Sequence, residues 1–280
     1  MKKVLHKIMC MALAAVMMIT VLSVAAPSEV EAAGLSFKSS GKSVVTIKDE
    51  DCYKGTGYKT HYIKYKPKNT GYVTLKFQNA SNIYSYSFGY VTLCNKSKKS
   101  ISQKEELWHN GYNKSLFYTR TYAVKKNQTY YFAVKCDGGT KITANFTKVA
   151  KSTANTKAKA KNIAKGKTAK GVILAGENKA DWYKIKMTSS KKLKITCTAK
   201  TNGDMNKHGI KVTFYDKNGK KWTSDSYVTM TTANPKNGMN IYMSSNYGSQ
   251  HTIPTGTYWV KVERLSKQSS GYYTLKWSTY

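Results

Sequence analysis

Two stretches of the sequence decide the fold: HYIKYK at residues 61–66 and DWYKIK at residues 181–186, which predict the same β-strand. Three more matching pairs follow in the same order. They are VTLCNK (91–96) with VTFYDK (212–217), NQTYYFAV (127–134) with TGTYWVKV (255–262), and TANF (143–146) with TLKW (274–277). The offset grows from 120 to 131 residues, whereas a solenoid repeat is about 20–50 residues long. The sequence therefore predicts two copies of one domain.

The two copies together predict an all-β fold of two tandem antiparallel β-sandwiches, one per copy and each jelly-roll-like in form. Apolar residues alternate with polar ones in YVTLKF (72–77) and in KLKITC (192–197), as expected for strands with one face in a core. Cys197 matches Phe77 in this pairing and is expected to be a buried apolar residue. The side chains expected to point inward are Val73, Leu75, Phe77, Leu193, Ile195 and Cys197.

The chain begins with a predicted secretory signal peptide at residues 1–32. Lysines precede an apolar stretch over residues 8–26, and small residues precede a cleavage site after Ala32. The alternative for the apolar stretch is a membrane anchor. We expect a secreted, extracellular protein, either free or associated with the cell wall, with no membrane insertion once the signal is removed.

The two predicted sandwiches span residues 34–149 and 162–280. Residues 150–161 lie between them and consist mostly of Lys, Ala, Thr and Ser. Such a segment has little to bury and its like charges repel, so it predicts a flexible basic linker. The same charges make it a candidate contact for an anionic surface; the alternative is a charge run that is only solvated.

Positive charge dominates the composition, with 47 Lys and Arg against 14 Asp and Glu and a formal net charge of +33. Only Arg120 and Arg264 are arginine. Arginine suits bidentate recognition of phosphates and bases, whereas lysine is a mobile point charge. The composition therefore favours diffuse attraction of polyanions over specific nucleic-acid binding. The alternative is that the lysines keep a secreted β-protein soluble or reflect base composition.

Four cysteines follow the predicted signal. Three of them, Cys52, Cys94 and Cys136, lie in the first copy. One disulfide at most can form among three thiols, and the spacing leaves open which pair it joins. The spacing matches no zinc site.

The second copy carries the motifs of a known family. Residues 160–173 (AKNIAKGKTAKGVI) lead into DWYKI at 181–185, and VTFYDKNG (212–219), GTYWVKV (256–262) and GYYTL (271–275) follow. This order resembles the bacterial pre-peptidase C-terminal domain, and the first copy resembles a diverged relative. The resemblance implies a noncatalytic, jelly-roll-like sandwich of the kind appended to secreted peptidases, with a surface- or substrate-binding role.

The resemblance also implies a calcium site, which some relatives build from an acidic residue at the start of the Asp-Trp/Tyr strand. Asp181 has that position here, with Glu177 and Asn178 nearby. Calcium takes six to eight oxygen ligands, and the segment before the second copy lacks the relatives' acidic cluster. A calcium site at Asp181 and Glu177 is therefore the lesser expectation. Otherwise Asp181 caps a turn or pairs with a lysine, and no cofactor is expected.

The sequence contains no recognisable catalytic motif. It has no HExxH run, no GxSxG elbow and no phosphate-binding loop, and its histidines are scattered. Adjacent acidic residues at 49–51 and 105–106 are typical of solvated loops. We therefore predict no catalytic residue and expect a chain that is not an enzyme.

Aromatic residues supply the candidate binding sites. Tyr84, Tyr86, Phe88 and Tyr90 share one face of a strand, and the pattern favours the core for that face, with an exposed stacking platform as the alternative. Long loops on rigid sandwiches often carry binding residues. The predicted ligand-binding residues lie in two such loops and are Trp108, Tyr112, Tyr242 and Tyr247.

Three functions follow as hypotheses. The first is attachment of both modules to an anionic wall polymer or polysaccharide. The second is binding of a neutral carbohydrate or a host matrix protein through aromatic loops. The third is targeting of a separate secreted peptidase. The duplication, the lysine excess and the lack of catalytic motifs favour the first.

Overall fold

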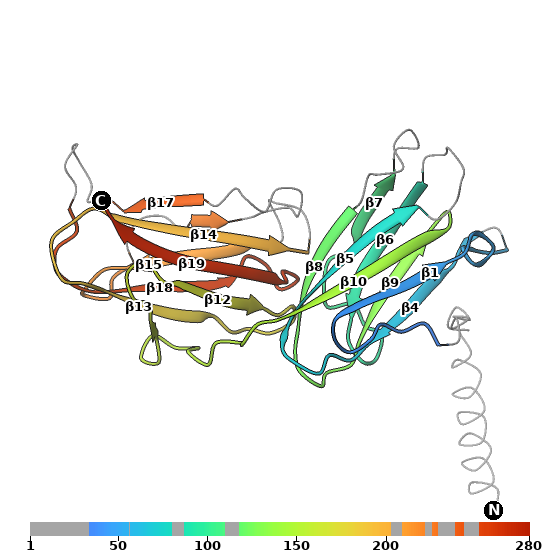
Figure 1. The fold of residues 1–280 in the computed structure, drawn as a ribbon, viewed down its shortest axis with the longest axis horizontal. Helices are drawn as coiled ribbons and strands as arrows, with labels where there is room; N and C mark the ends of the chain where they lie inside the picture. The colour runs from blue at the N-terminus through green and yellow to red at the C-terminus, as the bar shows by residue number, and fades with distance from the viewer. Residues whose placement is uncertain are drawn as a thin grey trace, which may run out of the picture. The chain divides into compact units, whose positions relative to one another are not determined.

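The computed structural model describes residues 34–55, 57–79, 87–109, 118–202, 209–221, 226–228, 239–243 and 252–280. The predicted signal peptide lies outside these residues. Within them the chain forms β-strands and one short 3-10 helix (Figure 1), which confirms the all-β prediction. The described part contains no helix that is long and apolar enough to span a membrane.

The first sandwich has two four-stranded antiparallel sheets. One has the order β1-β10-β5-β8 and the other β4-β9-β6-β7. The strands of the first sheet are β1 (Lys42–Ile47), β10 (Thr140–Lys148), β5 (Gly71–Asn79) and β8 (Tyr118–Val124). Those of the second are β4 (Thr60–Tyr65), β9 (Tyr130–Cys136), β6 (Ser87–Cys94) and β7 (Glu105–His109). A short excursion between β1 and β4 holds η1 (Asp49–Asp51) and the hairpin β2 (Tyr53–Lys54) and β3 (Gly57–Tyr58).

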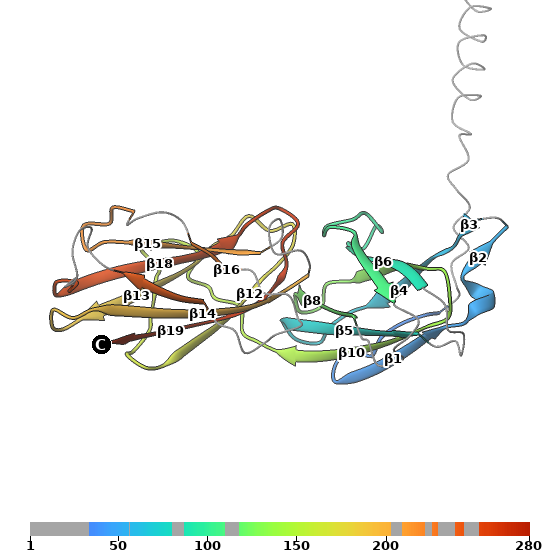
Figure 2. The same ribbon diagram turned by 90° about the horizontal axis from the view of Figure 1, so that it is seen from above.

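The second sandwich has one four-stranded and one five-stranded sheet. Their orders are β12-β19-β14-β17 and β11-β13-β18-β15-β16. The strands of the first are β12 (Thr168–Ile173), β19 (Gly271–Thr279), β14 (Leu193–Thr201) and β17 (Met239–Met243). Those of the second are β11 (Lys161–Asn162), β13 (Asp181–Met187), β18 (Gly256–Arg264), β15 (Ile210–Tyr215) and β16 (Ser226–Val228). In Figure 2, β15 and β18 lie in one layer and β14 and β19 in the other.

The two sandwiches have the same strand order. Each sheet of the first becomes a sheet of the second when β1 is read as β12 and β4–β10 as β13–β19, and β11 is an added strand of the second. The pairing register agrees too, because His61 lies opposite Val134 and Asp181 opposite Val262. The duplication seen in the sequence is therefore present in the topology, and the η1–β3 excursion is an addition of the first copy.

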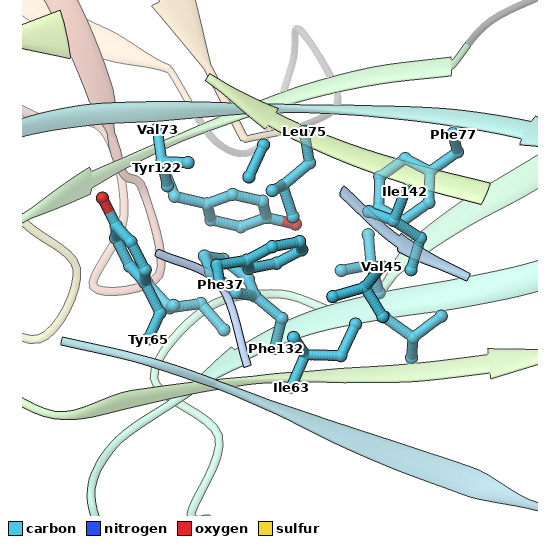
Figure 3. Close-up of a cluster of buried hydrophobic side chains, with 14 of the residues drawn as sticks. Phe37, Val45, Ile63, Tyr65, Val73, Leu75, Phe77, Tyr122, Phe132 and Ile142 are labelled. Carbon is cyan, nitrogen blue, oxygen red and sulfur yellow. The ribbon is translucent and has the colours of Figure 1, made fainter. Parts of the chain in front are cut away.

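Each core lies between the two sheets of its sandwich, as Figure 3 shows for the first. The six side chains predicted to point inward are all buried, which confirms the alternation pattern, and Cys197 is one of them. The predicted match of Cys197 to Phe77 is wrong. Cys197 lies opposite Leu275 as Leu75 lies opposite Ala144, because the step from Asp181 to Cys197 is two residues longer than the step from His61 to Leu75.

The register reveals one place where the two cores are filled differently. In the first sandwich Ile142 lies between Val45 and Phe77 on the neighbouring strands (Figure 3). In the second, the large residue Tyr273 takes the central position, and its neighbours are Gly171 and Ala199. A Cβ atom at Gly171 would collide with the Tyr273 ring. Small flanking residues therefore make room for the tyrosine, as close packing requires.

Residues 150–161, predicted as a flexible linker, lie along the edge of the second sandwich. Ala154 and Ala160 are buried, and the Ala154 carbonyl accepts a hydrogen bond of 2.7 Å from the Trp182 backbone N–H. The small alanines fit against the sheet, while the lysines between them stay at the surface.

Candidate binding surface

The outer face of the β13-β18-β15 sheet carries aromatic rings among lysines. Burial alternates along β13 and β18, so the residues between the buried positions point away from the core. On the same face Tyr215 ends β15, opposite Trp259. We call this set the Trp–Lys face, and its residues are Trp182, Lys184, Tyr215, Trp259 and Lys261.

The side chains of the Trp–Lys face interleave across strands. Trp182 lies opposite Lys261, and Lys184 lies opposite Trp259. The centroids of the Trp182 and Tyr215 rings are 5.0 Å apart, and all three aromatic side chains are half-buried. The arrangement places flat apolar surfaces beside ammonium groups, which suits a ligand with both sugar-like rings and negative charges.

Residues 150–161 contribute one more lysine to this face. The Lys157 Nζ atom lies 4.3 Å from the centroid of the Trp259 ring and donates a hydrogen bond of 3.4 Å to the Gly219 carbonyl. A cation over an aromatic ring is attracted by the ring's quadrupole. The segment predicted as a contact for anionic surfaces is thus part of the face.

Two hollows adjoin the Trp–Lys face. The larger has a volume of about 840 Å³, and lysines at 157, 184 and 186 line it together with Trp259. The smaller, of about 430 Å³, lies beside Trp182 and is lined by Lys179, Lys261, Arg264 and others. Both are therefore rimmed by cations and by one indole ring each.

The equivalent sheet of the first sandwich repeats the arrangement with tyrosines. Tyr62 and Tyr131 hold the positions of Trp182 and Trp259, with the same cross-strand register. The Lys98 Nζ atom lies 4.8 Å from the Tyr62 ring and 5.7 Å from the Tyr131 ring. We call Tyr62, Lys64, Tyr90, Lys98 and Tyr131 the Tyr–Lys face.

Tyr90 belongs to the aromatic stripe that the sequence assigned to the core. Its side chain is half-buried, and the Lys104 Nζ atom lies 4.0 Å above its ring. The core interpretation is wrong for Tyr90, because its neighbours Val91 and Leu93 take the inward positions. Tyr84 and Tyr86 lie outside the described residues, as does the side chain of Phe88.

The four predicted ligand-binding residues stay predictions. Tyr112 and Tyr247 lie outside the described residues. Trp108 is in β7 and Tyr242 in β17, but their side chains also lie outside the described part. The sequence reasoning overlooked Trp182, Tyr215 and Trp259, although each directly neighbours a buried strand residue in the repeated motifs and alternation assigns such positions to the outer face.

Asp181 is buried and makes a hydrogen bond inside the second sandwich. It is 2 % exposed, and its Oδ2 atom accepts a hydrogen bond of 2.7 Å from the Tyr273 hydroxyl. The hydroxyls of Tyr273 and Tyr183 are also 2.7 Å apart. Burial raises the pKa of Asp181 to about 6, although the bond from Tyr273 opposes the rise.

Asp181 and Glu177 do not fit a calcium site. They share a cavity of about 280 Å³ with Lys125, Lys151 and Lys179, and Glu177 pairs with Lys151 and Lys125. Partial burial acts to raise the pKa of Glu177, but the two lysines outweigh it and hold that pKa below its ordinary value. Across the described ranges, no three His, Cys, Asp or Glu side chains cluster as metal ligands, whereas calcium needs six or more oxygens.

Comparison with known proteins finds similarity among solved structures. No family model and no curated protein matches the chain. The pre-peptidase C-terminal domain of a collagenase from Bacillus anthracis is 18% identical, with a TM-score of 0.28; the match covers 42% of this chain and 94% of that one. This is the family that residues 160–280 resemble.

Two further matches cover more of the chain. The CBM22-1-CBM22-2 tandem domain of Xyn10C from Paenibacillus barcinonensis is 8% identical, with a TM-score of 0.22, and the match covers 86% of this chain and 92% of that one. Tripeptidyl peptidase 2 is also 8% identical, with a TM-score of 0.31, and covers 87% of this chain but only 24% of its own.

Proposed function

We propose that this chain is a secreted, noncatalytic binding protein that attaches to an anionic extracellular polymer through the Trp–Lys face. The observation that carries the proposal is the interleaving of Trp182, Tyr215 and Trp259 with lysines on one sheet surface. Aromatic rings offer large apolar contact areas, and lysines pair with carboxylate, sulfate or phosphate groups. A polymer of acidic sugars presents both features.

The Tyr–Lys face supports a second attachment point. It repeats the register of the Trp–Lys face with smaller rings, so we expect it to bind more weakly. Two linked sites raise the apparent affinity when both reach the same polymer.

The lysines that cover the rings do not block such a ligand. A cation–π contact at an exposed site is worth about 0.5–1 kcal/mol, and a long lysine side chain moves aside at little cost. An anionic ligand would keep the ammonium group close while its ring replaces the lysine over the indole.

The test is cosedimentation of the purified protein with Gram-positive cell walls, before and after removal of their anionic polymers. Salt is raised from about 0.02 M to about 0.5 M, which shortens the range of charge attraction several-fold. We expect binding that is lost with salt and with removal of the anionic polymers.

Matched variants separate the face from the overall charge. The pair Lys184→Ala/Lys186→Ala removes one exposed lysine of the Trp–Lys face and a second one beside it, and Lys165→Ala/Lys167→Ala removes two exposed lysines from a loop. We expect at least a roughly tenfold loss of affinity for the first pair and less than about twofold for the second. Equal losses would show that diffuse charge, and not this face, binds the polymer.

A second candidate function is binding of a neutral carbohydrate, and the two indole rings favour it. Trp259→Ala, with the 58% exposed Tyr280→Ala as an aromatic control, tests the rings directly. If binding survives high salt and removal of the anionic polymers but is lost in Trp259→Ala, the ligand is a neutral glycan and not an anionic polymer. Absence of binding to any wall would favour a host matrix ligand or a separate peptidase as partner.

A further inference from the structure

Two cysteines of the first sandwich lie side by side in its interior. The Sγ atoms of Cys52 and Cys136 are 3.3 Å apart, and the two residues are 0% and 5% exposed. Cys52 follows η1, whereas Cys136 ends β9, so the pair joins segments that are 84 residues apart in sequence. A disulfide needs an S–S distance of about 2.05 Å, which a small side-chain rotation would supply.

The excursion that carries Cys52 has no counterpart in the second sandwich. Residues 48–59 join β1 to β4, whereas residues 174–180 join β12 to β13. The register places Arg264 at the position of Cys136. The copy with the longer connection is therefore the one with a thiol pair at its base.

Polar contacts hold the same excursion on the turn after β9. The Tyr53 hydroxyl donates to the Asp137 carbonyl at 2.7 Å, and the Gly139 N–H donates to the Asp49 carboxylate. Cys52 lies between Asp49 and Tyr53 in the chain, and Cys136 directly precedes Asp137, so these contacts keep the two cysteines near each other. Neither thiol has to search for the other once the fold forms.

We propose that Cys52 and Cys136 form a disulfide that fastens the η1–β3 excursion to β9 when the protein folds in an oxidising compartment. Of the three thiols in the first sandwich, Cys52 and Cys136 are then the bonded pair. Cys94 instead contacts the Thr92 carbonyl at 3.9 Å, and Cys197 lies in the core of the other sandwich. A metal site is the other use of paired thiols, but in the described part no third ligand lies close enough, whereas structural zinc takes four ligands.

The reaction is a thiol–disulfide exchange with a disulfide-carrying oxidant, R–S–S–R. One protein thiolate attacks the oxidant to give a mixed disulfide and releases RS⁻. The second thiolate then attacks the protein sulfur of that mixed disulfide and releases a second RS⁻. The two cysteine protons end on the two RS⁻ groups, so two protein thiols are oxidised and one R–S–S–R is reduced to two RSH.

Burial determines when the bond forms. Burial raises the pKa of both thiols above the ordinary value, and the thiolate is the reactive form. The folded interior also excludes the oxidant. We expect the bond to form during folding, and at least about tenfold faster then than in the folded, reduced protein.

The test is refolding of the purified protein in mixed reduced and oxidised glutathione, followed by alkylation and a non-reducing tryptic map. Cys52 falls in peptide 49–54, Cys136 in peptide 136–141 and Cys94 in peptide 77–96. We expect peptides 49–54 and 136–141 to be linked, with a chain mass about 2 Da lower than that of the reduced protein. Complete alkylation of both cysteines, or a link to peptide 77–96, would overturn the proposal.

A thermal measurement tests the same bond without the map. We expect the oxidised protein to lose at least about 5 °C of Tm when a reductant is added. The variant Cys52→Ala/Cys136→Ala should show no response to the reductant, and Cys94→Ala/Cys197→Ala should keep it. A response that disappears only in Cys94→Ala/Cys197→Ala would contradict the assignment.

Discussion

Equivalent strand positions in the two sandwiches hold a histidine in the first and an aspartate in the second. His61 in the first and Asp181 in the second are both buried, and both lie opposite a valine on the neighbouring strand. The His61 Nε2 atom lies 3.0 Å from the Asp51 carbonyl oxygen, whereas Asp181 accepts a hydrogen bond from Tyr273. Asp51 belongs to the η1 excursion that only the first copy has, and Tyr273 fits only where small neighbours flank it. Each buried polar residue is therefore matched to a feature of its own copy.

The two residues give opposite responses to acid. Burial lowers the pKa of His61, so the folded state resists protonation and stability falls as the pH drops below about 6.5. Burial raises the pKa of Asp181 to about 6, so its contribution to stability is largest below about pH 4 and declines as the pH rises to 6. Acid thus weakens the first sandwich at the position where it strengthens the second.

The largest expected effect comes from filling the space beside Tyr273. Gly171→Val gives the second copy the valine that the first copy has at the equivalent position, Val45. The new side chain would collide with the Tyr273 ring. Overpacking of this kind costs about 3 kcal/mol of unfolding free energy. Urea unfolding followed by tryptophan fluorescence in a Trp108→Phe background measures it, because Trp182, Trp259 and Trp277 lie in the second sandwich whereas Trp108 lies in β7 of the first.

A second substitution checks the cause of that loss. Gly171→Val/Tyr273→Ile transplants the pair found in the first copy and should recover more than half of the lost stability. The remainder reflects Asp181 and Tyr183, which lose the Tyr273 hydroxyl, and the space beside Ala199, which Phe77 fills in the first copy. A loss below about 1 kcal/mol in the single variant would contradict the packing explanation.

Asp181→Asn should give an effect of similar size, but only in its pH dependence. A carboxyl whose pKa is raised from its ordinary value of 3.8 to about 6 in the folded state loses about 3 kcal/mol of stabilisation between pH 4 and pH 7.5. Asparagine does not titrate but still accepts a hydrogen bond from Tyr273. The difference in unfolding free energy between the variant and the wild type should change by about that amount in urea titrations across this range. A constant difference would show that Asp181 titrates normally.

His61→Gln sharpens the comparison from the other side, with a smaller effect. The Asp51 carbonyl partly stabilises a protonated imidazole, so the shift in its pKa is opposed by that contact. Replacement by glutamine should make the first sandwich less sensitive to acid below about pH 6.5. Hydrogen exchange of β4 and β9 peptides at pH 5 and pH 7 measures this. Equal acid sensitivity in variant and wild type would exclude His61 as the cause.

The sequence predicted the parts of the structure that depend on alternation within one strand. Leu75 and Leu193 follow a period of two and are buried as expected. What could not be predicted depends on which residues meet across strands, because insertions change the register and local patterns do not record it. The grouping of Trp182 with Tyr215 and the contact of Cys52 with Cys136 are both of this kind.

The different filling of the two cores also bears on how a duplicated chain avoids pairing with itself wrongly. Tandem copies with one strand order invite exchange of equivalent strands during folding. With β10 in the place of β19, Ile142 would leave a void between Gly171 and Ala199, and the reverse exchange would force Tyr273 between Val45 and Phe77. Both mismatches cost stability. Together, Gly171, Ala199 and Tyr273 therefore favour pairing of each strand with partners from its own copy.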